Sequence, residues 1–233
     1  PKTAKRMYFD VIPKAVDEYH QQLRAYETQD VKARLNNPVW HIHGGDVPKS
    51  DMVVPFSMLL NLASVSSAED KSQLWGFIQR YAPEATPETN PGMDAAAGHA
   101  VRYFNDFVKP TKVFRAPTEL EREALEDLRD RLSVYMPREN LPLELGIPTQ
   151  KVGEKTVSGE KVQSYTNPEE LQQIVFDVGR DRFDPLRDWF KALYQVLLGA
   201  DQGPRFGGFI ALYGVEETVA LIDDALAGKL TSA

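Results

Sequence analysis

Several residues and motifs that carry chemistry in other proteins are missing from this sequence. Cysteine is absent from the 233 residues, which excludes disulfides, thiolate catalysis and cysteine-type zinc sites. No apolar run approaches the roughly 18–20 residues that cross a bilayer. Neither the Gly-x-x-x-x-Gly-Lys-Ser/Thr phosphate loop nor the Gly-x-Ser-x-Gly nucleophile motif occurs. With four histidines, few bases are available for a nucleophilic triad, and we predict no catalytic residues.

Basic residues are also too few to attract nucleic acid to the whole chain. The sequence has 27 Lys and Arg against 34 Asp and Glu, a net charge of −7. Binding to a polyanion would therefore need a local patch, and nothing indicates DNA. The hydrophobic fraction of 42% is enough to form a globular core. The first residue is Pro1 rather than Met and no secretory signal follows, so we expect a piece of a longer, cytoplasmic polypeptide without a membrane segment.

Helical periodicity dominates the chain, because apolar residues recur at spacings of three and four. The pattern predicts helices over 4–26 (divided or kinked at Pro13), 54–64, 67–81, 94–108, 118–132, 167–178, 184–199, a short stretch ending at 214, and 215–228. Asn167 and Asp184 are the expected N-terminal caps, Thr118 opens the helix over 118–132, and Gly199 is the expected end of a helix. The predicted fold class is all-α.

Proline and glycine residues interrupt the helical periodicity between residues 137 and 166. We therefore predict two helical lobes, 1–136 and 167–233, separated by a linker or insertion over 137–166. A small β-hairpin near 150–162 is one interpretation of this stretch and a loop is the other.

His41 and His43, with Asp46 nearby, are the candidates for a metal site. In an extended loop, side chains two residues apart point the same way, so two imidazoles could converge on one ion. A third strong ligand is not evident. We favour imidazoles that bond to the backbone, and predict no metal; an independent metallohydrolase is the alternative.

A cluster of basic and aromatic residues follows the predicted insertion. Its members are Arg180, Arg182, Arg187, Trp189, Lys191, Tyr194, Arg205 and Phe206. Arginine can meet a phosphate or a base edge, and Phe206 can offer a stacking face to an unpaired base. In the alternative interpretation, Trp189 and Phe206 are core residues. The cations then pair with Asp181, Asp184 and Asp188.

Five strings in this sequence are similar to a known family. They are YFDVIPKAVDEY (8–19), NPVWHIH (37–43), VPFSMLLNLAS (54–64), DWFKALYQVLLG (188–199) and GPRFGGFIALYGVEETVALI (203–222). In this order they resemble the C-terminal region of class I lysyl-tRNA synthetases. The resemblance implies a helical connecting lobe followed by an anticodon-binding lobe of the α-helical cage type, with tRNA(Lys) as partner.

The same resemblance implies that a Rossmann catalytic domain precedes this region in the parent protein. Activation of lysine with ATP and Mg²⁺ would take place there, and this fragment alone should hold no cofactor and be inactive. The anticodon region would correspond to about 167–221. Within it, the candidates for tRNA contact are Arg180, Arg187, Trp189, Lys191, Tyr194, Arg205 and Phe206.

Two other functions stay open at this point. The first is the related glutamyl-type lobe, which would bind a different anticodon. The second is a helical protein–protein module, with exposed Trp40 and Trp75 as interface anchors. Residues 111–233 carry 15 basic and 21 acidic residues, so tight binding of tRNA by this region alone is not expected.

Overall fold

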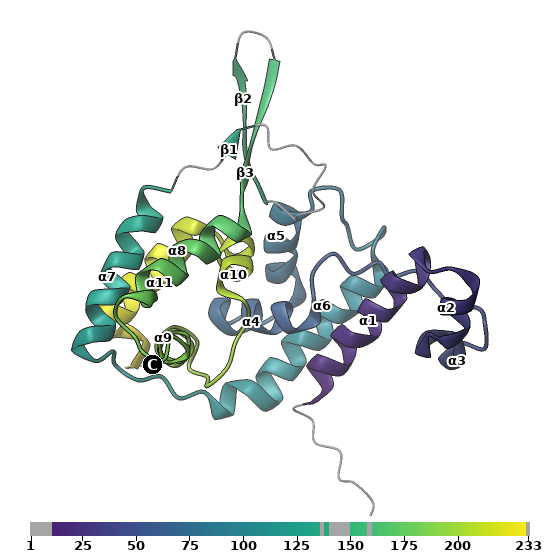
Figure 1. Ribbon diagram of the computed structural model, residues 1–233, viewed down its shortest axis with the longest axis horizontal. Helices are drawn as coiled ribbons and strands as arrows, with labels where there is room; N and C mark the ends of the chain where they lie inside the picture. Colours follow the sequence, from purple (N-terminus) through teal and green to yellow (C-terminus); the bar gives the residue numbers. More distant parts are fainter. Residues whose placement is uncertain (1–10, 136–137, 140–149, 158–159, 232–233) are drawn as a thin grey trace, which may run out of the picture.

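The body of the protein is built from α-helices, which confirms the predicted fold class (Figure 1). The computed structural model describes residues 11–135, 138–139, 150–157 and 160–231. Its α-helices are α1 (Ile12–Thr28), α2 (Val31–Asn36), α3 (Pro38–Ile42), α4 (Phe56–Ser66), α5 (Lys71–Tyr81), α6 (Pro91–Tyr103), α7 (Glu119–Ser133), α8 (Pro168–Arg180), α9 (Arg187–Leu193), α10 (Phe206–Tyr213) and α11 (Val215–Leu226). Two π-helical turns, η2 (Phe104–Val108) and η5 (Tyr194–Leu198), extend α6 and α9.

A small antiparallel sheet is the exception to the helical fold. It contains β1 (Arg138–Glu139), β2 (Gln150–Val157) and β3 (Glu160–Thr166) in the order β1-β3-β2. The hairpin expected near 150–162 is thus present and runs on to Thr166, which is buried at its base. In Figure 1 the hairpin projects away from the helices.

The buried apolar residues form two clusters. One lies on α4, α5, α6 and η2, with Leu212 of α10 added; we call it the α4–α6 core. The other lies on α7 to α11 and η5; we call it the α7–α11 core. Helix α7 therefore packs with the second cluster, although the sequence placed residues 1–136 in the first lobe. The domain boundaries themselves stay a prediction.

Local capping signals begin and end several helices as the sequence indicated. Thr118 and Glu121 form a reciprocal capping box at the start of α7. The Asn167 side chain accepts from the backbone N–H of Glu169 at the start of α8. Gly199 ends η5 with a φ of 65°, a left-handed conformation that glycine adopts without strain. Asp184 was predicted wrongly as a cap, because α9 begins only at Arg187 and has no side-chain cap.

Two other helix starts are capped from distant parts of the chain. The carboxylate of Asp17 in α1 accepts backbone N–H bonds from Phe56 (2.5 Å) and Ser57 (3.1 Å) at the start of α4. The side-chain oxygen of Gln172 in α8 accepts from the N–H of Gly207 (2.9 Å) at the start of α10. These bonds fix α1 against α4 and α8 against α10.

Candidate nucleic-acid interface

The two aromatic residues proposed to meet RNA are core residues in the structure. Trp189 and Phe206 are both fully buried. The indole N–H of Trp189 donates to the carbonyl of Val175 at 2.9 Å, and the ring stacks on Phe183 with centroids 5.3 Å apart. The Phe206 ring packs edge-on against Phe209 at 5.6 Å. The prediction that these two rings stack on a base is therefore corrected, since neither presents a face to solvent.

Arg205 does reach the surface, where its side chain is 61% exposed. It precedes α10, and its guanidinium donates two hydrogen bonds to the carboxylate of Glu169, at 2.8 and 2.5 Å. Glu169 lies in the first turn of α8, where a negative charge suits the helix dipole. A phosphate or base edge at Arg205 would have to compete with this carboxylate.

Tyr194 positions the turn that leads to Arg205. Its hydroxyl donates to the carbonyl of Pro204 at 2.9 Å, and its ring fills the space where a side chain on Gly203 would lie. Burial raises the pKa of the Tyr194 phenol. The half-buried ring therefore supports the turn, and contact with RNA at this residue stays a prediction.

The remaining candidates lie on the outer surface of α8 and α9. Arg180 pairs with Asp177 at 3.0 Å and Arg187 approaches Asp188 at 3.8 Å. Lys191 is exposed and has no carboxylate within 4.0 Å among the described residues. The alternative prediction of ion pairs is thus confirmed for Asp188, and Arg180 instead uses Asp177.

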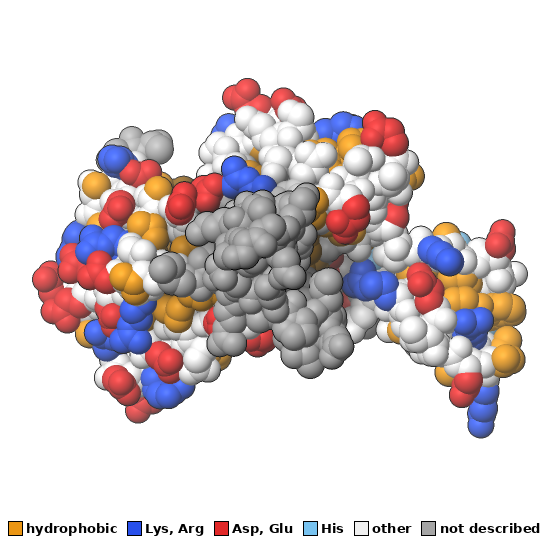
Figure 2. Space-filling view, turned by 90° about the horizontal axis from the view of Figure 1, so that it is seen from above, with side chains coloured by type: hydrophobic (Ala, Val, Ile, Leu, Met, Phe, Trp, Pro, Cys, Tyr) orange, Lys and Arg blue, Asp and Glu red, His pale blue; other side chains and the backbone are white. Residues whose placement is uncertain are grey.

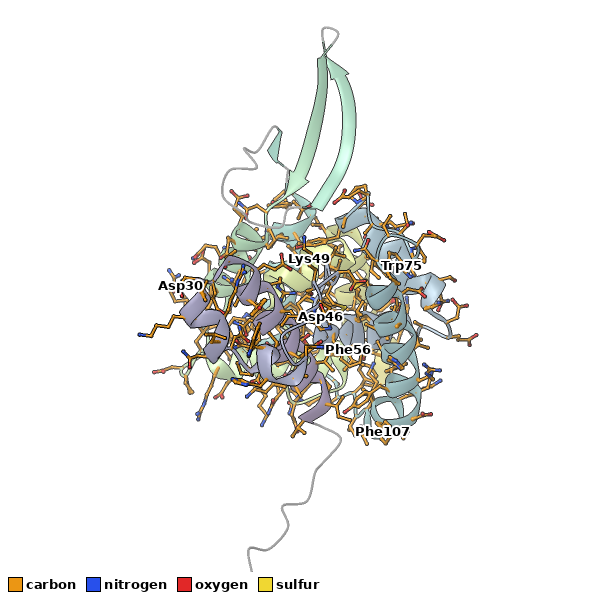
Figure 3. The ribbon with its side chains drawn as sticks, turned by 90° about the vertical axis from the view of Figure 1, so that its right-hand side faces the viewer. Asp30, Asp46, Lys49, Phe56, Trp75 and Phe107 are labelled. Atoms are coloured by element: carbon orange, nitrogen blue, oxygen red, sulfur yellow. The ribbon has the colours of Figure 1, made fainter. Side chains whose placement is uncertain are left out.

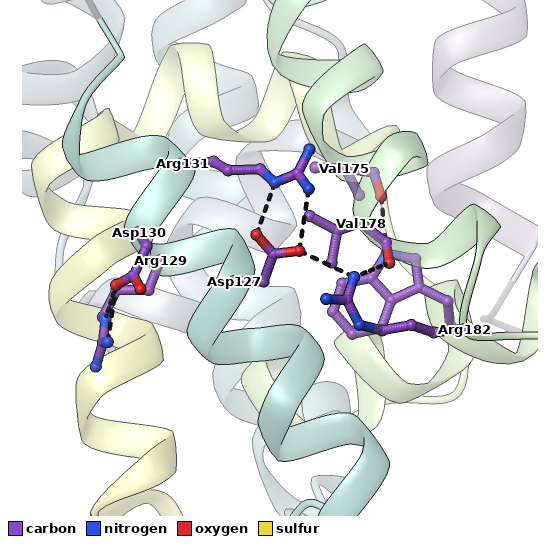
Figure 4. A network of polar contacts seen from close by, with 8 residues as sticks. Asp127, Arg129, Asp130, Arg131, Val175, Val178 and Arg182 are labelled. Atoms are coloured by element: carbon purple, nitrogen blue, oxygen red, sulfur yellow. Dashed lines mark hydrogen bonds and ion pairs between the residues drawn. The ribbon is translucent and has the colours of Figure 1, made fainter.

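Arg182, also part of the cluster, has a structural role (Figure 4). Its guanidinium donates to the carbonyl of Val178 at 2.8 Å and contacts the carboxylate of Asp127 at 2.9 Å. Arg131 binds the same carboxylate at 2.7 and 3.1 Å. Hydrogen bonding from Arg131, with a smaller contribution from Arg182, lowers the pKa of Asp127. This network joins α7 to the end of α8.

The candidates therefore do not form one cluster. Arg205 lies beside the first turn of α8, whereas Arg180 is the last residue of that helix. A helix of 13 residues is about 20 Å long at a rise of 1.5 Å per residue. One nucleotide cannot contact both ends, so any RNA contact in this lobe would be spread along α8.

The histidine pair is arranged differently from the expected loop. His41 lies in the last turn of α3, and His43 follows that helix. On a helix, side chains two residues apart diverge, so the two imidazoles do not converge. The Nε2 of His43 lies 2.8 Å from the Tyr19 hydroxyl. Among the described residues, no group of three or more His, Asp or Glu side chains is placed to hold a metal ion.

The two tryptophans suggested as interface anchors are largely inside the protein. Trp75 is 6% exposed and its indole N–H donates to Asp94 at 3.0 Å. Trp40 is partly buried and stacks on Tyr26, with ring centroids 6.5 Å apart. Neither is the exposed anchor that the protein–protein interpretation required.

The sequence analysis did not identify Lys112, a lysine held between the two cores. Its ammonium donates to the carbonyl of Ser64 at 2.9 Å and lies over the rings of Phe104 (5.6 Å) and Phe114 (4.7 Å). Burial lowers the pKa of Lys112 to about 8. The one signal in the sequence is its place in a proline-flanked segment between two helices, which does not by itself predict burial.

Comparisons with known proteins show what the chain is similar to. None of the described helices combines the length and hydropathy of a bilayer-spanning segment, and no family model matches the sequence. The chain is 70% identical over 232 residues to a lysine–tRNA ligase of Roseobacter denitrificans, an alignment that includes essentially the whole chain. It is 42% identical over 229 residues to a lysine–tRNA ligase of Rickettsia conorii. The chain spans about 39% of the length of each of these relatives, so along its whole length it is similar to part of a lysine–tRNA ligase.

Proposed function

We propose that this chain is the C-terminal, anticodon-binding region of a class I lysine–tRNA ligase. It would recognise tRNA(Lys) during ATP-dependent synthesis of lysyl-tRNA in the cytoplasm. The observation that carries this proposal is the 70% identity over 232 residues to a protein named as a lysine–tRNA ligase. The helical body supports it, because the resemblance to class I enzymes implies an α-helical cage at this place.

The chemistry of aminoacylation belongs, in this proposal, to a catalytic domain outside the chain. ATP would need a phosphate-binding loop and Mg²⁺ would need converging carboxylates. The sequence has no such loop, and the described residues include no cluster of three or more carboxylate or imidazole groups. We therefore assign no catalytic step to this chain.

The described cations of α8 to α10 are the proposed anticodon contacts. Arg205, Lys191, Arg187 and Arg180 reach solvent, and each can donate to a phosphate or to the edge of an unpaired base. Lysine anticodons are rich in uracil, which stacks weakly. Discrimination would then depend on hydrogen bonds and on the shape of the helical surface.

Binding to transcripts that differ only in the anticodon tests this proposal. We expect the chain to bind tRNA(Lys) at low salt and to lose several-fold in affinity when the anticodon is exchanged. Arg205→Ala should reduce that preference, because it removes a fork of donors from the start of α10. Lys229→Ala is a suitable control, since Lys229 pairs with Asp224 outside the proposed site.

The outcomes of this experiment separate the alternatives. Preference for a glutamate anticodon would favour the glutamyl-type lobe. Equal binding to all transcripts would contradict an anticodon-reading role, and no binding to any RNA would favour the protein–protein module. A separate assay for lysine-dependent pyrophosphate exchange should show none with this chain; measurable exchange would contradict the proposed location of the catalytic site.

A further inference from the structure

The end of the molecule that carries α2 and α3 differs in charge from the rest. We call residues Arg24–Lys49, from the last part of α1 to the loop after α3, the α2–α3 wing. The wing carries four basic and three acidic residues, whereas residues 51–231 carry 19 basic and 28 acidic residues. Asp30 caps α2 through the N–H of Ala33 (2.8 Å), so its carboxylate lies at a helix N-terminus.

None of the four basic residues of the wing has an ion pair with a described carboxylate, whereas most of the basic residues near α7 to α10 have one; Arg122 and Lys191 are the exceptions there. Near α7 to α10, carboxylates lie within 4.0 Å of Arg129, Arg131, Arg180, Arg182, Arg187 and Arg205. For Arg24, Lys32, Arg34 and Lys49, no carboxylate lies within that distance in the part of the chain that the structure describes. An unpaired cation can bind a phosphate and release that phosphate's counterion without first breaking a protein ion pair.

The wing is a built surface even though it has little core of its own. Arg34 donates from Nε to the carbonyl of Tyr26 (3.0 Å) and from Nη2 to that of Glu27 (2.8 Å), which ties α2 to the end of α1. The side chain of Asn37 donates to Gln22 (3.2 Å) and accepts from the N–H of Val39 (3.0 Å). These bonds orient the wing before any partner arrives, which lowers the entropy lost on binding.

Three aliphatic residues lie beside these cations on the outside of the wing. Val31 is 75% exposed, Ile42 66% and Leu35 48%. Figure 2 shows hydrophobic side chains gathered at this end, with Lys and Arg as well as Asp and Glu side chains around them, and Figure 3 looks onto the same end with Lys49 labelled. Cations around a small apolar surface suit the phosphates and sugars of a nucleic-acid backbone.

We infer that the α2–α3 wing binds the sugar–phosphate backbone of tRNA, away from the anticodon and without reading its sequence. This inference rests on the proposed function, because that function supplies RNA as the partner. In Figure 1 the wing and helix α7 lie at opposite ends of the long axis. In this inference the wing contributes affinity for tRNA, and the α7–α11 end discriminates between anticodons.

A charge-matched pair of variants of the full chain tests the inference. The wing variant combines Arg24→Gln, Lys32→Gln and Lys49→Gln, three cations whose side chains make no hydrogen bond to a described residue. The control combines Lys14→Gln, Lys71→Gln and Lys229→Gln, which removes the same charge from side chains paired with Glu18, Asp94 and Asp224. Binding of a tRNA(Lys) transcript is measured from about 50 to 200 mM salt.

The wing variant should bind tRNA at least about tenfold more weakly at low salt. Its slope of log K against log salt should be smaller by about 2 to 3, from roughly 0.7–0.9 for each lost phosphate contact. The control should keep its slope within about 0.5 of the wild-type value. The wing variant should weaken binding to an anticodon-exchanged transcript by the same factor as binding to tRNA(Lys), because the wing does not read sequence.

Two outcomes would overturn the inference, and a third would overturn the proposed function alone. Equal slopes for the wing variant and the control would overturn the inference, while an intact preference for the lysine anticodon would leave the proposed function standing. The reverse pattern, a slope that depends on the wing without any anticodon preference, would overturn the proposed function alone. If the double variant Val31→Ser, Leu35→Ser differs from the wild-type chain in sedimenting mass while its affinity for RNA is the same, the wing is a protein–protein contact instead.

Discussion

The α7–α11 core and the α2–α3 wing both contain aromatic and basic residues, but these residues have different surroundings in the two regions. In the core, aromatic rings are enclosed and arginines are paired with carboxylates, as Trp189 and Arg182 show. In the wing, only Asn37 and Val39 are buried, and the cations have no carboxylate partner among the described residues. Stability is concentrated in one region and unpaired positive charge in another. Variants in the two regions should therefore affect different measurements.

The largest loss of stability is expected from Trp189→Ala. The substitution removes a fully buried ring and its hydrogen bond to Val175, and comparable large-to-small changes cost about 3–5 kcal/mol. Urea unfolding followed by circular dichroism measures the change. Trp40→Ala in the wing is the comparison and should cost clearly less, because that ring is only partly buried. Equal losses would contradict the contrast between core and wing.

Gly207→Ala should come next, with a cost of about 2–3 kcal/mol from overpacking. A Cβ at this position would lie 2.1 Å from the carbonyl oxygen of Pro168 and 2.6 Å from the backbone nitrogen of Gln172. Backbone atoms cannot move aside as a flexible side chain can, so α8 and α10 would have to separate. Gly208→Ala is a matched control, since its nearest neighbour is the end of the Met58 side chain at 3.7 Å. A neutral Gly207→Ala would show that α8 and α10 are less closely packed than described.

Because Lys112 is largely buried, we expect the free energy of unfolding to rise with pH in mildly alkaline solution. Its pKa is about 8 in the folded protein and about 10.5 when unfolded, so between these values the unfolded chain binds more protons. The free energy of unfolding therefore increases from about pH 8 towards pH 10. The shift corresponds to about 3 kcal/mol at 1.36 kcal/mol per unit, and partial exposure reduces this to roughly 1–2. Lys112→Met should abolish the increase, as measured by urea unfolding at pH 7.5 and 9.5; an unchanged slope would contradict the burial of this amine.

The smallest effect is expected from Val31→Ser on the wing. The side chain is 75% exposed, so unfolding should change by less than about 0.5 kcal/mol. Thermal melts at two protein concentrations provide the measurement. A large or concentration-dependent loss would mean that another surface covers this residue, and would weaken the contrast with the core.

The features that the sequence predicted correctly are those decided by neighbouring residues. The helix start at Thr118, the Asn167 cap and the Gly199 terminus depend on groups within a few positions, and all three are present. The helix predicted over 167–178 is likewise present as α8. The short helices α2 and α3 were missed: no helix was predicted over 31–36, and the five residues of α3 were taken for a loop between Pro38 and Gly44.

The site was harder to predict because its geometry depends on distant residues. Arg205 meets Glu169, which is 36 positions away in sequence. Phe206 follows directly on an exposed arginine and yet is fully buried, since α10 packs against α8. Periodicity within α10 cannot show which face is covered, because that helix is apolar on every side. Separating a stacking ring from a core ring needed the tertiary structure.

The carboxylate of Asp17 links the wing mechanically to the interior. It lies on the same helix that carries the wing, and it holds the first two amides of α4, which runs through the α4–α6 core. Any rotation of α1 that RNA imposes at the wing would pull this negative charge away from the head of α4. A force applied at the edge of the protein would thus reach its centre through the packing of α1 on α4 and through this carboxylate.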